Sequence, residues 1–373
     1  MQDVMQGLYL TLVIVWSVSL FTMVWGTLFT VWRVKWAPPR SSENMLPVSI
    51  LKPLKGVDPG LYDNLASFAK QDYPVYEVIL SVASADDPAL TVANQVIADH
   101  PHAPFRVIVG DVQAGINPKV NNLVRPEKLA QYDIVLVSDS NIRAEPHYLR
   151  DIVPHLAEGT GCVTAIISGF GGQGLGGLLE EQHLNSFYAR WMSIAHSFGA
   201  AFIIGKTMLY RRSDAAKFGG IAGLAGYVAE DFWMGKMTTR VVKKKVKLTC
   251  RPVRQYIGYI SLNRFVQRHA RWAVLQKKCA PWVFALEPFQ FSLVAGLVGA
   301  IGWDGLFGVQ SVFPFVGTIL TWAFLDLWLI RELGGRPSAL GWMMREVLSP
   351  CIWLDALTGS TVEWRGQKIK VRG

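Results

Sequence analysis

Hydrophobic and polar positions divide the chain into an apolar start, an alternating middle and a second apolar region. From Val4 to Trp32 no residue carries a formal charge, and about 20 apolar residues suffice for a helix to cross a bilayer core. A cleaved signal peptide would be shorter, with a basic start and a small-residue cleavage site. We therefore predict an uncleaved transmembrane anchor over residues 1–34.

Basic residues follow this anchor at once. Arg33, Lys35 and Arg40 place the next part of the chain in the cytoplasm by the positive-inside rule. The segment 35–47 is rich in Pro and Ser, a composition typical of a linker between membrane and domain.

Short β-branched runs then alternate with helical patterns. The runs are VSILKPL, YEVILSVAS, FRVIVG and DIVLVSDS, and helices are expected at 61–71 and 88–99. Strands that alternate with helices predict an α/β domain with a mostly parallel sheet covered on both faces. We place this domain at residues 48–280.

The later part of this domain has a less regular pattern. The glycine-rich tract Gly169 to Gly177 is expected to form a flexible loop over a site, with a plain linker as the alternative. The segment IIGKT, Ile203 to Thr207, resembles the end of a phosphate-binding loop, but Ala200 stands where that motif needs glycine. We therefore expect a strand there.

Apolar composition returns after Pro281. Two spans are predicted within residues 281–331, at about 288–303 and 305–330. The first is short and the second contains Asp326; tilting, or burial against a neighbouring helix, would accommodate both features. Residues 332–373 are expected to be an interfacial tail with a basic cytoplasmic end, and an odd number of spans leaves the N-terminus outside.

Composition supports a membrane protein. The 373 residues are 51% hydrophobic, with 14 tryptophans, which is too apolar for an ordinary soluble enzyme. The net charge of +9 comes from Lys and Arg beside apolar segments, so the expected partner is the lipid bilayer and not nucleic acid. The four cysteines are scattered, without the spacing of a disulfide framework or a zinc site, as fits a reducing compartment.

Acidic residues follow two of the predicted strands. Asp86 and Asp87 come after the second, and Asp139 and Asn141 end the fourth, where ligands bind in sheets of this kind. Alternation along a strand puts Asp139 and Asn141 on one face, and their hard oxygens suit Mg²⁺ or Mn²⁺. A helix-capping role for Asp139 fits the motif equally well.

A second acidic candidate is Asp231 in the segment AED. Its neighbour Glu230 and the aromatic residues Phe232 and Trp233 favour a raised proton affinity, in the range that a general base needs. A solvated helix N-terminus is the alternative.

A third candidate is the segment RHARW on a predicted helix. Arg268 and Arg271 are three apart and share a face, so they could grip a diphosphate, while Trp272 offers an apolar wall. From spacing alone, a basic helix lying on the membrane is favoured. His269 is expected at the surface, because no partner has metal-site spacing.

These motifs together resemble a known family. SILKPLKGVDPGLYDNL, DYPVYEVIL, DDPA, GINPKVNNL, DSNIR, AEDF and RHARW occur between residues 48 and 272 in the order seen in ceramide glucosyltransferases, glycosyltransferase family 21. The resemblance implies a GT-A nucleotide-sugar-binding fold, a UDP-sugar donor, a divalent cation (Mn²⁺ or Mg²⁺) and an inverting single displacement.

The resemblance also assigns roles to individual residues. Asp231 would be the catalytic base, and Asp139 would contact the metal-bound diphosphate, with Asn141 as the second metal ligand. The donor-binding residues would be Lys55, Asp87, Lys119, Asp139, Arg268, Arg271 and Trp272, of which the last three form the closing motif. Asn141 is a weaker metal ligand than a carboxylate, and the segment 185–199 matches the family poorly where the lipid acceptor should be recognised.

The expected reaction moves a sugar from a UDP-sugar to the primary hydroxyl of ceramide, and the expected sugar is glucose. The alternative is transfer of N-acetylglucosamine to a hopanoid or another membrane lipid. A polysaccharide synthase would need a channel built from more spans, and a lipid-binding scaffold would have lost a site residue. The expected location is a bacterial inner membrane or a Golgi- or ER-type membrane, with the catalytic domain on the cytoplasmic face.

Overall fold

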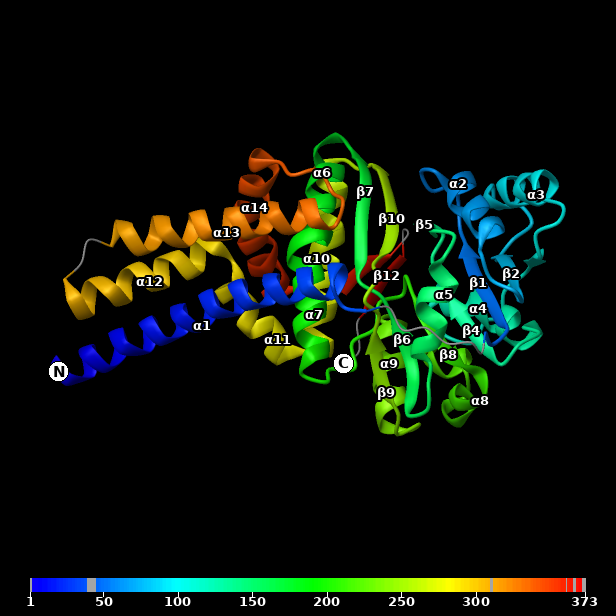
Figure 1. Cartoon of the computed structure of the whole chain (residues 1–373), viewed down its shortest axis with the longest axis horizontal. Coiled ribbons are helices and arrows are strands. Elements are labelled where there is room, and N and C mark those ends of the chain that lie inside the picture. Colours follow the sequence, from blue (N-terminus) through cyan, green and yellow to red (C-terminus); the bar gives the residue numbers. More distant parts are fainter. Residues whose placement is uncertain (1, 39–44, 309–310, 360, 365–366, 371–373) are drawn as a thin grey trace. The chain divides into compact units, whose positions relative to one another are not determined.

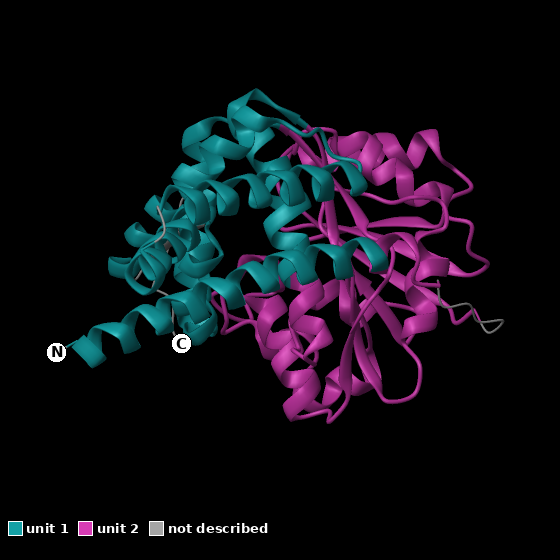
Figure 2. Ribbon diagram, turned by 60° about the vertical axis from the view of Figure 1, so that its left-hand side comes forward, with its two compact units in different colours: residues 1–32, 172–191, 259–373 teal, residues 33–171, 192–258 magenta. Residues whose placement is uncertain are grey.

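The computed structural model describes residues 2–38, 45–308, 311–359, 361–364 and 367–370. Contacts divide the chain into two compact units, which Figure 2 colours separately. Unit 1 comprises Met1–Trp32, Gly172–Trp191 and Tyr259–Gly373, and unit 2 comprises Arg33–Gly171 and Met192–Gly258. Because the units interleave along the chain, the domain boundaries expected at residues 48 and 280 stay a prediction.

A seven-stranded sheet forms the centre of unit 2, in the order β3-β2-β1-β4-β8-β6-β9 (Figure 1). The strands are β1 Val48–Leu54, β2 Tyr76–Val82, β3 Phe105–Val109, β4 Ile134–Val137, β6 Thr160–Thr164, β8 Met208–Arg211 and β9 Lys245–Leu248. Strand β1 lies parallel to β2 and β4, whereas β8 is antiparallel to β4 and β6. The four strands predicted from the sequence and the mostly parallel sheet are confirmed.

Helices pack on this sheet and bury its apolar side chains. Helix α3 contacts β2 and β3, and α4 contacts β1 and β2. The core includes the fully buried Leu51, Ile79, Val135 and Met208. The helices of unit 2 are α2 Leu61–Ala66, η1 Ser67–Lys70, α3 Ala89–Asp99, α4 Pro118–Leu129, α5 Tyr148–Ile152, η2 Val153–His155, α8 Arg212–Ala215, η4 Ala216–Phe218, η5 Ile221–Leu224 and α9 Glu230–Arg240.

The glycine-rich tract is ordered secondary structure, so the expected flexible loop is wrong. It forms the end of β7 (Ile167–Gln173) and the start of α6 (Gly174–His183), and β7 belongs to a small sheet with β5 (Ile142–Arg143) and β10 (Val253–Tyr259). A Cβ on Gly171 would lie 2.5 Å from the Tyr256 ring, and one on Gly176 would lie 2.2 Å from the Ser261 carbonyl oxygen. The glycines therefore permit close packing. Composition alone does not distinguish this role of glycine from chain flexibility.

Unit 1 is mainly helical. Two helices in the described part of the chain, α1 (Gln2–Lys35) and α13 (Val312–Glu332), are long and apolar enough to cross a membrane. The span expected at 288–303 differs: α12 (Ser292–Phe307) meets that test only with Pro281–Gln290, from which it bends by 71°. The remaining elements are η3 Leu184–Tyr188, α7 Ala189–Ser197, which continues into unit 2, α10 Leu262–Cys279, α11 Pro281–Leu286, η6 Glu287–Gln290, α14 Ala339–Thr358 and the hairpin β11 Thr361–Trp364 and β12 Gln367–Lys370.

The charged residue in α13 is buried within unit 1, as the sequence analysis expected. Asp326 is 0% exposed, and its carboxylate lies 2.7 Å from Arg190 Nη1 and 2.5 Å from Arg345 Nη2. Trp342 Nε1 donates a hydrogen bond to Asp326 Oδ2 at 3.0 Å. The two guanidinium groups and the indole satisfy a charge that would otherwise be costly in an apolar helix.

Candidate active site

Loops at the carboxyl ends of β1, β2 and β4 are joined by hydrogen bonds. Gly56, after β1, donates its backbone amide to Asp87 Oδ1 at 2.8 Å, and Ala89 donates to the same oxygen at 2.9 Å. Ser140, after β4, donates to Asp58 Oδ2 at 2.5 Å. The structure therefore places Asp87 and the loop that carries the exposed Lys55 at the sheet edge where Asp139 also lies.

Asp139 is held between two lysines. Its Oδ1 lies 2.7 Å from Lys119 Nζ, and its Oδ2 lies 2.8 Å from Lys206 Nζ. Burial alone raises the pKa of Asp139, but the two ammonium groups outweigh burial and hold the pKa well below its ordinary value. Both oxygens thus serve ion pairs, and the next helix begins only at Tyr148, so the helix-capping alternative does not apply.

Asp231 and its neighbour Glu230 open helix α9. Lys119 Nζ lies 2.8 Å from Glu230 Oε1, so this lysine joins Asp139 to the start of α9. The Gly205 amide donates to Asp231 Oδ2 at 3.0 Å. Burial, then the negative charge of Glu230, raises the pKa of Asp231 to about 6. Lys119 therefore brings Asp139 together with the Glu230–Asp231 pair from a different element, and the pKa of Asp231 is raised, as the sequence predicted.

Asn117 is a site residue that the sequence analysis did not single out. Its Oδ1 accepts hydrogen bonds from the Lys119 and Val120 amides at 2.9 and 3.2 Å, which starts helix α4. Its Nδ2 donates to Glu230 Oε2 at 3.0 Å. One buried side chain thus fixes both ends of the Lys119–Glu230 ion pair, and the Asn-Pro helix start was the only signal for it.

Lys206 and Gly205 were also missed, because the segment IIGKT was expected to be a strand. The segment instead turns: Ile204 and Thr207 form an isolated bridge, and β8 begins only at Met208. This turn brings Gly205 to Asp231 and Lys206 to Asp139. The strand prediction is wrong because a short apolar run cannot by itself exclude a turn.

The predicted metal ligands lie together. Lys206 Nζ donates to Asn141 Oδ1 at 2.9 Å as well as to Asp139 Oδ2, so one cationic group bridges the two oxygens. Among the described residues no group of three or more His, Cys, Asp and Glu side chains could hold a metal. Mg²⁺ commonly binds one or two carboxylates together with substrate phosphates. The oxygen pair therefore fits a cation that would complete its coordination with a phosphate-bearing ligand.

The segment RHARW lies on a helix of unit 1, as predicted. In α10 the Arg268 guanidinium stands 4.8 Å from the Trp272 ring centroid, and Arg268 Nε lies 3.4 Å from Glu180 Oε1. Arg271 is half-buried. Arg268, Arg271 and Trp272 belong to unit 1, whereas the carboxylates and lysines described above belong to unit 2.

His269 is buried, so its expected surface position is wrong. It is 7% exposed, and its Nε2 lies 2.8 Å from Glu180 Oε2. Glu180 is fully buried, and its pairing with His269 and Arg268 outweighs burial and lowers its pKa to about 2. No local pattern predicts the burial of His269, because its partner Glu180 lies 89 positions earlier in the chain.

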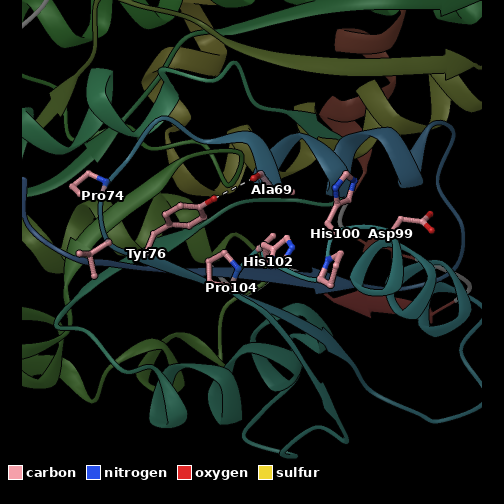
Figure 3. Close-up of a pocket in the computed structure, with 10 residues that line it drawn as sticks. Ala69, Pro74, Tyr76, Asp99, His100, His102 and Pro104 are labelled. Atoms are coloured by element: carbon pink, nitrogen blue, oxygen red, sulfur yellow. Dashed lines mark hydrogen bonds between the residues drawn. The ribbon is translucent and has the colours of Figure 1, made fainter.

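A separate pocket lies at the opposite edge of the sheet (Figure 3). It has a volume of about 560 Å³ and is lined by residues that include Tyr76, His100 and Pro104. Tyr76 begins β2, whereas Asp87 follows the end of that strand. The pocket is thus at the amino ends of the strands and is distinct from the cluster around Asp139.

A solved structure identifies the fold. The structure of the mannosyltransferase PcManGT from Pyrobaculum calidifontis is similar with a TM-score of 0.54 and 14% identity, over 93% of this chain and 97% of that one. This likeness shows the GT-A glycosyltransferase fold, as the ordered motifs implied.

The family follows from sequence relatives. Ceramide glucosyltransferase 1 of Caenorhabditis elegans is 28% identical over 87% of this chain and 71% of the relative. The ceramide glucosyltransferase of Komagataella phaffii is 26% identical over 87% of this chain and 82% of the relative. The model of glycosyl transferase family 21 matches residues 11–373. The chain belongs to this family and is a sugar-transferring enzyme, which confirms the resemblance.

Proposed function

We propose that the protein transfers a sugar from a UDP-sugar to the primary hydroxyl of ceramide, with inversion at the anomeric carbon. The proposed sugar is glucose. The observation that supports the proposal is the link through Lys119 from Asp139, the proposed diphosphate-binding carboxylate, to Glu230, the neighbour of the proposed base Asp231. The acceptor is taken from the relatives in Caenorhabditis elegans and Komagataella phaffii, both of which are ceramide glucosyltransferases.

Donor binding is assigned to the sheet edge of unit 2. Asp87 would contact the nucleotide, and Lys55 and Lys119 would face its negative charge. The ammonium of Lys119 is fixed by Asp139 and Glu230, and burial is outweighed by these carboxylates, which raise its pKa above the ordinary value. It therefore stays charged at neutral pH, as a group that stabilises a leaving diphosphate must.

Asp231 would act as the general base. Its carboxylate would accept the proton of the acceptor hydroxyl while the hydroxyl oxygen forms a bond to the anomeric carbon. The bond from that carbon to the diphosphate oxygen breaks, and UDP leaves with the electron pair. A pKa of about 6 leaves most of Asp231 deprotonated at neutral pH and still basic enough to take a proton.

Asp139 and Asn141 would hold a divalent cation, Mn²⁺ or Mg²⁺. Such a cation neutralises charge that develops on the leaving diphosphate. The PcManGT structure contains GDP-Man and Mn²⁺, which supports a cation at the corresponding step of this family of folds. Arg268, Arg271 and Trp272 are proposed to complete donor binding as the closing motif.

A membrane location suits this acceptor. Helices α1 and α13 can span a bilayer by length and composition, and Arg33 and Lys35 follow the apolar part of α1. By the positive-inside rule, the catalytic residues would face the cytoplasm. A lipid hydroxyl would then be reached at the bilayer surface without extraction of the acyl chains.

The test is a product assay with full-length protein purified in detergent. It is incubated with Mn²⁺, ceramide and either UDP-glucose or UDP-N-acetylglucosamine, and the lipids are identified by mass. Hexosylceramide from UDP-glucose is expected, and Asp231→Asn should lower its formation by about a hundredfold or more, the scale of general-base catalysis.

Two results would contradict the proposal. A product with a hopanoid in parallel reactions, and none with ceramide, would reject the acceptor while leaving the cluster of unit 2 as the site of transfer. Full turnover by Asp231→Asn would reject the base.

A further inference from the structure

Lys206 occupies the position between the two proposed metal ligands. Its Nζ lies 2.8 Å from Asp139 Oδ2 and 2.9 Å from Asn141 Oδ1, and its side chain is only 13% exposed. Oxygen atoms that converge on an ammonium group are the same kind that bind a divalent cation. The lysine is therefore bound where a metal ion would be held.

The backbone on both sides of Lys206 is anchored. The Gly205 amide donates to Asp231 Oδ2 at 3.0 Å, and the Thr207 amide donates to the Ile204 carbonyl at 3.1 Å. These bonds hold the backbone of the turn, whereas the Lys206 ammonium sits at the end of a flexible four-carbon chain. The ammonium can leave the oxygen pair without a change in the fold of the sheet.

The Lys206 ammonium and a metal ion compete for the same oxygens because both are positively charged. Ion pairs of 2.7 to 2.8 Å join the carboxylates of Asp139 and Glu230 to the ammonium groups of Lys119 and Lys206. Asp231 adds a third carboxylate next to Glu230. A divalent cation on Asp139 and Asn141 would lie beside Lys206, and like charges at that separation repel strongly in a half-buried site.

We propose that Lys206 is a built-in counter-ion that competes with a divalent cation for Asp139 and Asn141 until an anionic donor draws the ammonium away. The inference rests on the proposed role of Asp139 and Asn141 as cation ligands. A diphosphate supplies new oxygen partners for the displaced ammonium. Cation and nucleotide therefore bind cooperatively, each raising the affinity for the other by the same factor.

The experiment measures Mn²⁺ binding directly, without turnover. Full-length protein in detergent is titrated with Mn²⁺, and free Mn²⁺ is followed by its electron paramagnetic resonance signal. Without nucleotide, Lys206→Met should bind Mn²⁺ at least about tenfold more tightly than the unchanged protein, because a neighbouring positive charge is removed.

Lys244→Met is the matched control. Lys244 also forms an ion pair in unit 2, at 2.6 Å from Asp214, so its replacement removes the same charge from another place. Its Mn²⁺ affinity should stay within about twofold of the unchanged protein, because salt screens charges that are not at the site. Asp139→Asn added to Lys206→Met should cancel the gain and so locate it.

Repeating the titration with UDP tests cooperativity. UDP should tighten Mn²⁺ binding by a larger factor in the unchanged protein than in Lys206→Met, because only the unchanged protein has the Lys206 ammonium to displace; Lys119 stays paired with Asp139 and Glu230 in both proteins. If Lys206→Met loses its thermal unfolding transition, Lys206→Gln, which keeps a hydrogen-bond donor without the charge, takes its place.

The outcomes separate this inference from the proposed function. Equal Mn²⁺ affinity of the unchanged protein and the neutral Lys206 variants would overturn the counter-ion role. The expected Mn²⁺ pattern without any hexosylceramide product would support the counter-ion role and reject the proposed acceptor.

Discussion

The backbone amide of Gly205 donates a hydrogen bond to Oδ2 of Asp231 at 3.0 Å. This bond ties the turn before β8 to the start of α9, and the next residue in the turn, Lys206, contacts Asp139. One turn thus positions the proposed base and contacts the proposed diphosphate-binding carboxylate. Interactions of this kind hold catalytic groups at the separation that the reaction needs.

We predict that Gly205→Ala lowers turnover by about ten- to a hundredfold, the scale expected when catalytic groups are displaced by about 1 Å. An added Cβ would lie 2.7 Å from Lys119 Nζ and 3.5 Å from Asp231 Oδ2, so the ion-paired lysine must shift. The measurement is kcat for lipid glycosylation. Gly226→Ala is the control, because its added Cβ meets nothing within 4 Å; an equal loss in both variants would contradict the prediction.

The pH dependence of kcat/KM should report the pKa of Asp231. Its pKa is raised to about 6 by burial and by Glu230, above the ordinary value of about 3.9. The protonated carboxyl cannot accept a proton, so kcat/KM should be constant above pH about 7 and fall about tenfold per pH unit well below 6.

Initial rates at low donor concentration between pH 5 and 8 check this profile. A circular dichroism spectrum at each pH verifies that the fold persists. A midpoint near 4, the value of an unperturbed carboxyl, would show that Asp231 is not in the environment described here.

The sheet and its acidic edge were predictable because their signals are local. Strand β1 has the bounds expected from VSILKPL, and Asp139 lies two residues after Val137, the end of the apolar strand β4. A buried strand must be apolar along its length, and the residue after its end lies at the edge where ligands bind. Both rules need only neighbouring residues.

The partners of these acids were not predictable in the same way. Lys206 reaches Asp139 across 67 positions and Asn117 reaches Glu230 across 113. No periodicity within one element reports such a contact. The predicted surface position of His269 is wrong for the same reason, since Glu180, the carboxylate that allows its burial, lies 89 positions earlier.

Glu180→Gln should destabilise the protein by about 3 kcal/mol or more, the cost of breaking a buried ion pair by removing one partner. Glu180 is fully buried against His269 and Arg268, and its lowered pKa means that the stabilisation is present at neutral pH and is lost as the pH falls toward 2. Thermal unfolding in detergent at neutral pH measures the change.

The exposed Glu158 supplies the control for Glu180. Glu158→Gln should leave the unfolding temperature unchanged, because it removes no buried partner. If Arg268 binds the donor, Glu180→Gln should also raise KM for the UDP-sugar at temperatures where the variant stays folded. An unchanged unfolding temperature for Glu180→Gln would contradict the buried ion pair.

The ion pairs of Asp326 with Arg190 and Arg345 should stabilise the folded protein. Asp326→Asn leaves the buried Arg190 and Arg345 without their shared carboxylate, and an uncompensated buried charge costs about 3–5 kcal/mol. Asp304→Asn is the control, because Asp304 is exposed on helix α12. Adding Arg190→Met to Asp326→Asn should recover part of the loss, since it removes the guanidinium that has lost its partner, whereas Arg345 keeps its ion pair with Glu346 Oε1 at 2.6 Å. The four proteins of this double-mutant cycle, compared by thermal unfolding in the same detergent, measure the coupling energy. Additive losses would mean that Arg190 and Asp326 do not interact, whereas partial recovery would establish that their ion pair holds the helices of unit 1 together.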